Sequence, residues 1–219
     1  MTAEVSRRRL LQVVAAAVVA MPLTDLPLPR AAASGELSAD AETATLEAWS
    51  DTMVPGQKRW PGDRAVAGAT SGPGAVQAGA VDLMRFDAVG LGPALPGLAA
   101  ALNVEASRYA AAAGLPLDPA TPPFVGLSFP DRTALALELL DGTREDQVAW
   151  YALAAVAMLA FHTAAHLDTA DAVRTGHPGL AWLRFPAPDA DGLWRYPDFS
   201  YRRKLARTHP RTTRSGHPA

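Results

Sequence analysis

Two histidines, His162 and His166, are the side chains whose type and spacing best suit a metal ion. A spacing of four residues puts both imidazole rings on one face of a helix, as in metal-binding histidine pairs. No glutamate joins them in a His-Glu-x-x-His pattern, and a third ligand would have to come from Asp168, Asp171 or an unidentified segment. Two histidines near a helix end can equally form hydrogen bonds or contact a partner. We therefore expect no metal centre and keep this pair as the alternative.

The sequence patterns of several other catalytic classes are missing from the 219 residues. The chain has no cysteine, which excludes a disulfide scaffold, a thiol nucleophile and a cysteine-ligated metal. It has no Gly-x-Ser-x-Gly motif and no Walker A motif. The glycines between Gly90 and Gly97 lack the spacing of a dinucleotide-binding loop. We expect no catalytic residue in this chain and no cofactor bound by it.

Aromatic and basic residues concentrate near the C-terminus. Between Trp194 and Lys204, aromatic rings are interleaved with arginines, and both residue types are enriched at protein–protein interfaces. The alternative is that these side chains fold back over the chain's own core. The residues that we expect to contact a partner are Trp60, Trp194, Tyr196, Phe199, Tyr201, Arg202 and Arg203.

The charges of the chain are unevenly distributed, although its formal net charge is only −2. Residues 34–198 hold 20 acidic and 10 basic side chains, whereas residues 199–219 hold six basic and no acidic ones. Because the larger part of the chain is acidic, we expect no nucleic-acid partner.

Residues 1–33 have the pattern of an export signal. Arg7 and Arg8 precede an uncharged, Ala- and Val-rich run over residues 10–23, and Ala31-Ala32-Ala33 is a small-residue cleavage pattern. The Ser-Arg-Arg-x-Leu-Leu order resembles the bacterial twin-arginine signal, and the alternative is an ordinary secretory signal that carries three arginines. We therefore expect the twin-arginine translocase as a partner, and a periplasmic, cell-envelope or secreted location. That route carries folded proteins, often with a cofactor already bound. Since this chain has no recognisable cofactor motif, either it binds a cofactor that no motif reveals or a co-exported partner holds the cofactor.

The hydrophobic periodicity predicts an all-α fold, a single domain of about five helices with long Gly/Pro-rich loops. The expected helices cover residues 37–53, 75–88, 96–113, 130–142 and 143–171. The loop over residues 55–74 contains Trp60, and loops of this length are usually functional or disordered. The helical domain is expected to cover residues 34–176, followed by an extended aromatic and basic C-terminal arm over 177–219.

The longest expected helix has an unusual composition. Thr143, with Asp146 three residues later, resembles a capping box at its start. From Val148 to Phe161 it has no charged residue, so we expect both of its faces to be buried. A transmembrane span is not expected, because alanine supplies much of this run.

Three short motifs resemble the small-subunit family of gluconate 2-dehydrogenase (subunit 3), in an actinobacterial branch with twin-arginine signals. The motifs are Asp51-Thr-Met-Val-Pro55 after the first helix, Pro73-Gly-Ala-Val-Gln-Ala-Gly-Ala80, and Phe129-Pro-Asp-Arg132 before a Leu-rich helix. The resemblance covers about residues 40–170. The Gly-rich insertion between Pro55 and Pro73 and the aromatic arm depart from the subunit pattern.

The resemblance implies a non-catalytic exported small subunit that escorts a flavin-dependent dehydrogenase of the glucose–methanol–choline class. FAD is then expected in the large partner, and a cytochrome c subunit often completes such complexes. Two alternatives stay open on the sequence alone. One is a stand-alone secreted enzyme that uses a metal at His162 and His166, and the other is an envelope binding module.

Overall fold

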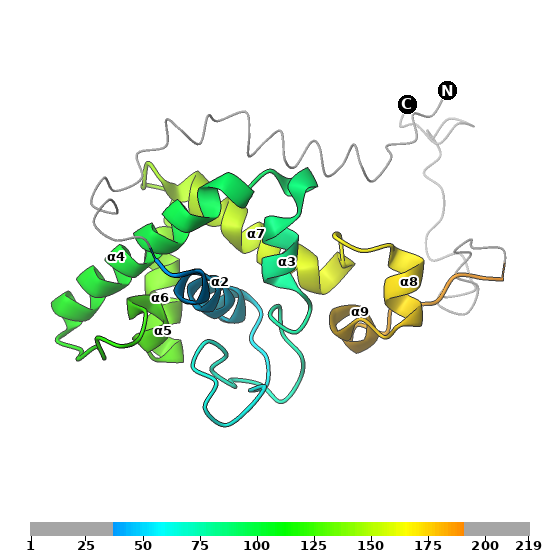
Figure 1. Cartoon of the computed structure of the whole chain (residues 1–219), viewed down its shortest axis with the longest axis horizontal. Helices are drawn as coiled ribbons and strands as arrows, with labels where there is room; N and C mark the ends of the chain where they lie inside the picture. Colours follow the sequence, from blue (N-terminus) through cyan, green and yellow to red (C-terminus); the bar gives the residue numbers. More distant parts are fainter. Residues whose placement is uncertain (1–36, 191–219) are drawn as a thin grey trace, which may run out of the picture. The chain divides into compact units, whose positions relative to one another are not determined.

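The computed structural model describes residues 37–190, which contain helices, turns and loops but no strand. Residues 37–185 belong to one compact unit, and Pro186 begins a second. The all-α prediction is confirmed for this part of the chain (Figure 1). Its helices are α2 (Ala39–Met53), α3 (Ala80–Arg85), η2 (Asp87–Val89), η3 (Gly92–Ala94), α4 (Leu95–Ala113), α5 (Pro123–Gly126), α6 (Phe129–Leu139), α7 (Gln147–Thr163), α8 (Thr169–Arg174) and α9 (Pro178–Trp182).

Helix α2 lies at the centre of this unit and packs against α3, α4, α5, α6 and α7. Ser38 caps its start by accepting the Ala41 N–H, and the chain leaves the helix at Val54, before Pro55. Trp49 is completely buried, and its ring lies 6.0 Å from Phe124 of α5 and 5.9 Å from Trp150 of α7. These three rings join α2, α5 and α7 into one buried apolar core.

Capping residues set the other helix ends that the sequence predicts well. Gly114 ends α4 in the left-handed conformation, at φ +66°. Ser128 caps α6, and Pro130 lies in its first turn, where a missing N–H costs nothing. The helix expected over 75–88 is shorter, because Gly79 adopts φ +77° and residues 75–79 form turns.

The long helix expected over 143–171 is in fact two helices. Ala164 adopts φ +48° and ends α7, and α8 begins five residues later. The expected capping box is also wrong. Thr143 bonds to Asp141, while the Asp146 carboxylate pairs with Arg144 and accepts the Trp150 indole N–H at 2.9 Å.

One face of α7 is exposed, which corrects the expectation that both faces are buried. Helix α3 and helix α9 pack against α7, and so does α2. Val148, Tyr151 and Met158 stay 37%, 52% and 43% exposed along one stripe of the helix. Across residues 37–190, no helix combines the length and the apolar character needed to cross a membrane.

The helical unit extends beyond residue 176, where the sequence pattern predicts the start of an extended arm. His177 caps α9, Leu180 is buried, and the compact unit ends at Phe185. Residues 186–190 contain no regular element. The rest of the expected arm, residues 191–219, lies outside the described residues.

Candidate functional site

The loop over residues 55–74 is fixed to α2 by a buried carboxylate. Asp51 has no exposed surface, and its two oxygens accept the backbone N–H groups of Gly56 at 2.9 Å and Ala67 at 2.8 Å. Burial raises the pKa of Asp51, against the opposing effect of these two N–H groups and of Arg132. A single side chain therefore holds the beginning and the middle of the loop.

A buried guanidinium holds the same loop from the other side. Arg132 of α6 is 2% exposed and donates to the carbonyl oxygens of Arg64 and Ala65 at 2.7 and 2.8 Å. It also donates to the carbonyls of the segment around α5, at Phe124, Val125 and Leu127. Burial lowers the pKa of Arg132 to about 10, although the nearby Asp51 carboxylate opposes that shift. Arg132 thus ties loop, α5 and α6 together through backbone oxygens.

A second acidic side chain fixes the tip of the loop. Asp63, 1% exposed, accepts the Val66 N–H and pairs with Arg59 at 2.7 Å. Arg59 also pairs with Glu47 of α2 at 2.6 Å. Burial by itself would raise the pKa of Asp63, but Arg59 and the Val66 N–H hold it below its ordinary value.

The two ends of the loop approach each other so closely that only glycine fits. A Cβ on Gly74 would lie 2.5 Å from the Gly56 nitrogen and from the Val54 oxygen. Gln77 bridges the same place, because its Oε1 accepts the Gly74 N–H and its Nε2 donates to the Gln57 carbonyl. The residues of all three motifs quoted for the subunit resemblance, among them Asp51, Gly74 and Arg132, therefore meet at the base of this loop.

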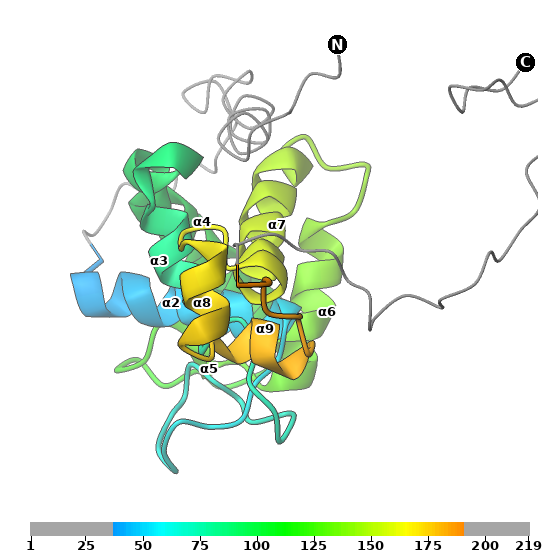
Figure 2. The same cartoon turned by 90° about the vertical axis from the view of Figure 1, so that its right-hand side faces the viewer.

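Two exposed tryptophans lie on or against the fixed loop. Trp60 is 54% exposed, and the Arg59 guanidinium lies over its ring, 4.7 Å from the centroid. Trp182, at the end of α9, is 61% exposed and rests on Gly72, where a Cβ would lie 2.8 Å from the indole. Figure 2 shows the loop and α9 next to each other. We call loop 55–74 with Trp60 and Trp182 the aromatic platform.

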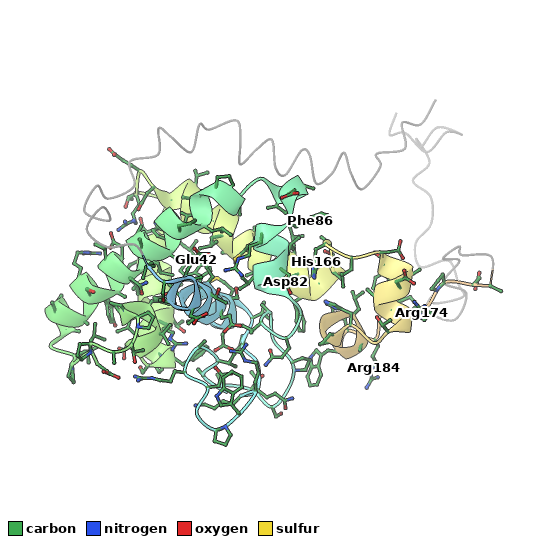
Figure 3. The ribbon with its side chains drawn as sticks, in the orientation of Figure 1. Glu42, Asp82, Phe86, His166, Arg174 and Arg184 are labelled. Carbon is green, nitrogen blue, oxygen red and sulfur yellow. The ribbon has the colours of Figure 1, made fainter. Side chains whose placement is uncertain are left out.

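The predicted histidine pair does not share a helix face. His162 is exposed at the end of α7, with its Nδ1 2.8 Å from the Met158 carbonyl. His166 follows the break at Ala164 and lies near Asp82 of α3 (Figure 3) and His177, with ring centroids of the two histidines 6.4 Å apart. No group of three His, Asp or Glu side chains suited to a metal ion occurs between residues 37 and 190.

Most of the predicted site residues lie outside the part of the chain that the structure describes. Of the expected partner-binding residues, Trp60 is exposed as a contact residue must be, and its role stays a prediction. The other expected partner-binding residues lie outside the described residues: Trp194, Tyr196, Phe199, Tyr201, Arg202 and Arg203. Arg7 and Arg8 of the export signal also lie outside them. The sequence pattern gives no role to Asp51, Arg132 or His177, although a Pro-Gly turn begins four residues after Asp51 and aspartates near turns often accept backbone N–H groups.

The fold and the platform define a small all-α protein with an ordered, tryptophan-bearing surface loop. The sequence matches, over residues 40–219, the model of the family described as family of unknown function (DUF5987), and the chain belongs to that family. Searches of curated proteins and of solved structures gave no match.

Proposed function

We propose that the chain is a non-catalytic, exported small subunit that binds a flavin-dependent dehydrogenase of the glucose–methanol–choline class and escorts it during export. The protein-binding part of this proposal rests on the exposure and support of Trp60. The indole of Trp60 is half-exposed, and the Arg59 guanidinium lies over its ring. The backbone of the loop that carries Trp60 is held by hydrogen bonds to the buried side chains of Asp51 and Arg132. Tryptophan and arginine are the residues that most often dominate interface energy.

The rigidity of the platform supports this proposal. An ordered loop loses little conformational entropy on binding, so more of the contact energy remains as affinity. The exposed apolar stripe on α7 offers further contact area of the same kind. The choice of a flavoprotein as the partner rests on the subunit resemblance and on the expected twin-arginine signal, which suits an escort for a folded, cofactor-bearing protein.

Capture of the tagged full chain from its native host, under mild conditions, tests the proposal. Mass spectrometry should identify a flavoprotein in stoichiometric amount, and the eluate should absorb as flavin. Trp60→Ala should lose most of this flavin, whereas Leu137→Ala, which truncates another exposed apolar side chain on α6, should retain it. Recovery of this chain alone, without flavin absorbance, would refute the proposed escort function.

Export provides a second readout. With Arg7→Lys and Arg8→Lys together, both this chain and the flavoprotein should stay inside the cell. Normal export of the flavoprotein in that double variant would show that it does not depend on this signal.

A further inference from the structure

The segment that carries Trp182 packs against α7 and α8 but takes little part in the main apolar core. Helix α9 buries only Gly179 and Leu180. Leu180 belongs to a small apolar cluster with Ala164 and Ala172, separate from the main core around α2. A segment with so few buried apolar contacts can open locally without disturbing the main core.

Two histidines lie at this attachment. His177 is 7% exposed; its Nε2 lies 3.1 Å from the Ala78 carbonyl, and its Nδ1 accepts the Leu180 N–H at 3.3 Å. These partners require a neutral ring with its proton on Nε2. A second proton, on Nδ1, would remove the cap of α9 and place an unpaired N–H in a buried position.

His166 adds a second imidazole to the same joint. Its Nδ1 is buried and has no hydrogen-bond partner within the described structure. Its Nε2 lies 2.8 Å from where a Cβ on Gly79 would be. The charged or titratable groups that act on it are Asp82 of α3, which favours the imidazolium, and His177, which disfavours it.

We propose that His166 and His177 form an acid-sensitive latch that holds α9, and with it Trp182, against the loop of the aromatic platform. In the closed latch His177 is neutral, because its Nδ1 accepts the Leu180 N–H. In acid, two imidazolium rings whose centroids lie 6.4 Å apart would repel each other and His177 would lose its bond to the Leu180 N–H, so the charged pair opens the latch. The biological consequence rests on the proposed function: opening would withdraw Trp182 from the partner-binding surface.

The surroundings of His166 also favour opening of the latch in acid. Burial lowers the pKa of His166, an effect that Asp82 opposes and that His177 reinforces. The folded state therefore takes up this proton less readily than an opened one. The closed state loses stability as pH falls below about 6.5, the ordinary histidine value.

Fluorine NMR of the full chain labelled with 5-fluorotryptophan tests the latch, with the Trp182 resonance assigned by Trp182→Phe. In the wild type, this resonance should shift as the pH falls from 8 to 5, while the resonances of the core residues Trp49 and Trp150 stay in place. The measurement uses no partner protein, so a failed latch and a failed escort function are distinguishable.

Three histidine variants separate the latch from general titration. His166→Gln and His177→Asn should each flatten the Trp182 shift, since asparagine can still cap α9 but cannot gain a proton. His162→Gln is the matched control and should titrate like the wild type, because His162 is exposed and outside the joint. A Trp182 resonance that does not change with pH in the wild type, or one that shifts in both His166→Gln and His177→Asn as it does in the wild type, would overturn the proposal.

Gly179→Ala opens the latch without acid. A methyl group on Gly179 would collide with the Phe161 carbonyl of α7 and push α9 away. At pH 8 the Trp182 resonance of this variant should lie at the acid position of the wild type. If it stays at the neutral position, displacement of α9 does not move Trp182, and the proposal is wrong.

Discussion

The loop over 55–74 and the segment with α8 and α9 each bring one exposed tryptophan to the platform, but they are held in opposite ways. The loop has no regular structure, yet Asp51, Asp63 and Arg132 fix its backbone from below. The α8–α9 segment is regular, yet it rests on a small separate cluster and on a histidine cap. Regular secondary structure is therefore a poor guide to rigidity here, and buried polar contacts are a better one.

The largest expected effect comes from breaking the loop's buried guanidinium. Arg132→Met removes five hydrogen bonds to backbone carbonyl oxygens and leaves the Asp51 carboxylate without a nearby positive charge. The free energy of unfolding should fall by about 3–5 kcal/mol, as for other broken buried charge networks. Urea unfolding measures it. Arg174→Met, at an exposed pair on α8, is the control and should change it by less than about 0.5 kcal/mol.

A smaller loss is expected where the loop ends meet. Gly74→Ala puts a methyl group against backbone atoms that cannot move aside, which should cost about 1–3 kcal/mol of unfolding free energy. Gly92→Ala is the matched control, because nothing lies within 4 Å of the added Cβ. Equal stability of the two variants would mean that the loop ends are not tightly packed.

Acid should affect the two regions in different pH ranges. The pKa of Asp63 is held below its ordinary value, so the unfolded state takes up that proton first and the loop loses stability only as pH falls below about 3.8. The α9 joint loses stability as pH falls below about 6.5, because burial lowers the pKa of His166. In urea unfolding, the stability difference between wild type and Asp63→Asn should be large at pH 7 and shrink at pH 3. A difference that is independent of pH would contradict the assignment.

The smallest effect on stability is expected at Trp60, the tryptophan that we propose contacts the partner. Trp60→Ala should change the unfolding free energy by less than about 0.5 kcal/mol, since much of the ring is in solvent. Thermal unfolding of the variant checks this. A large loss would mean that Trp60 serves the fold, and the capture experiment with Trp60→Ala would then no longer report on binding.

Local chemistry made much of the fold predictable. The helix ends expected at residues 53 and 113 and the start expected at residue 130 agree with the structure to within one residue, because Pro55, Gly114 and Pro130 restrict the backbone there. The end of α7 was not predictable, because alanine rarely adopts the positive φ that Ala164 has. Helix α9 was missed because it is short and begins at a histidine cap that no common pattern signals.

Only part of the aromatic platform was predictable from the sequence. Trp60 stood out as a large apolar residue in a Gly/Pro-rich loop. The loop's order depends on Asp51 and Arg132, which lie far apart in the chain and meet only in the folded core. Contacts of that kind have no periodicity or spacing, so a single sequence does not indicate them.

Hydrogen–deuterium exchange of the full chain at pH 7 tests the contrast between the two regions most directly. After correction for intrinsic rates, the Gly56 and Ala67 amides, which donate to buried Asp51, should exchange at least about tenfold more slowly than the Leu180 and Ala181 amides of α9. Loop amides that exchange as fast as those of α9, or faster, would contradict a fixed platform and remove the physical basis for a binding surface there.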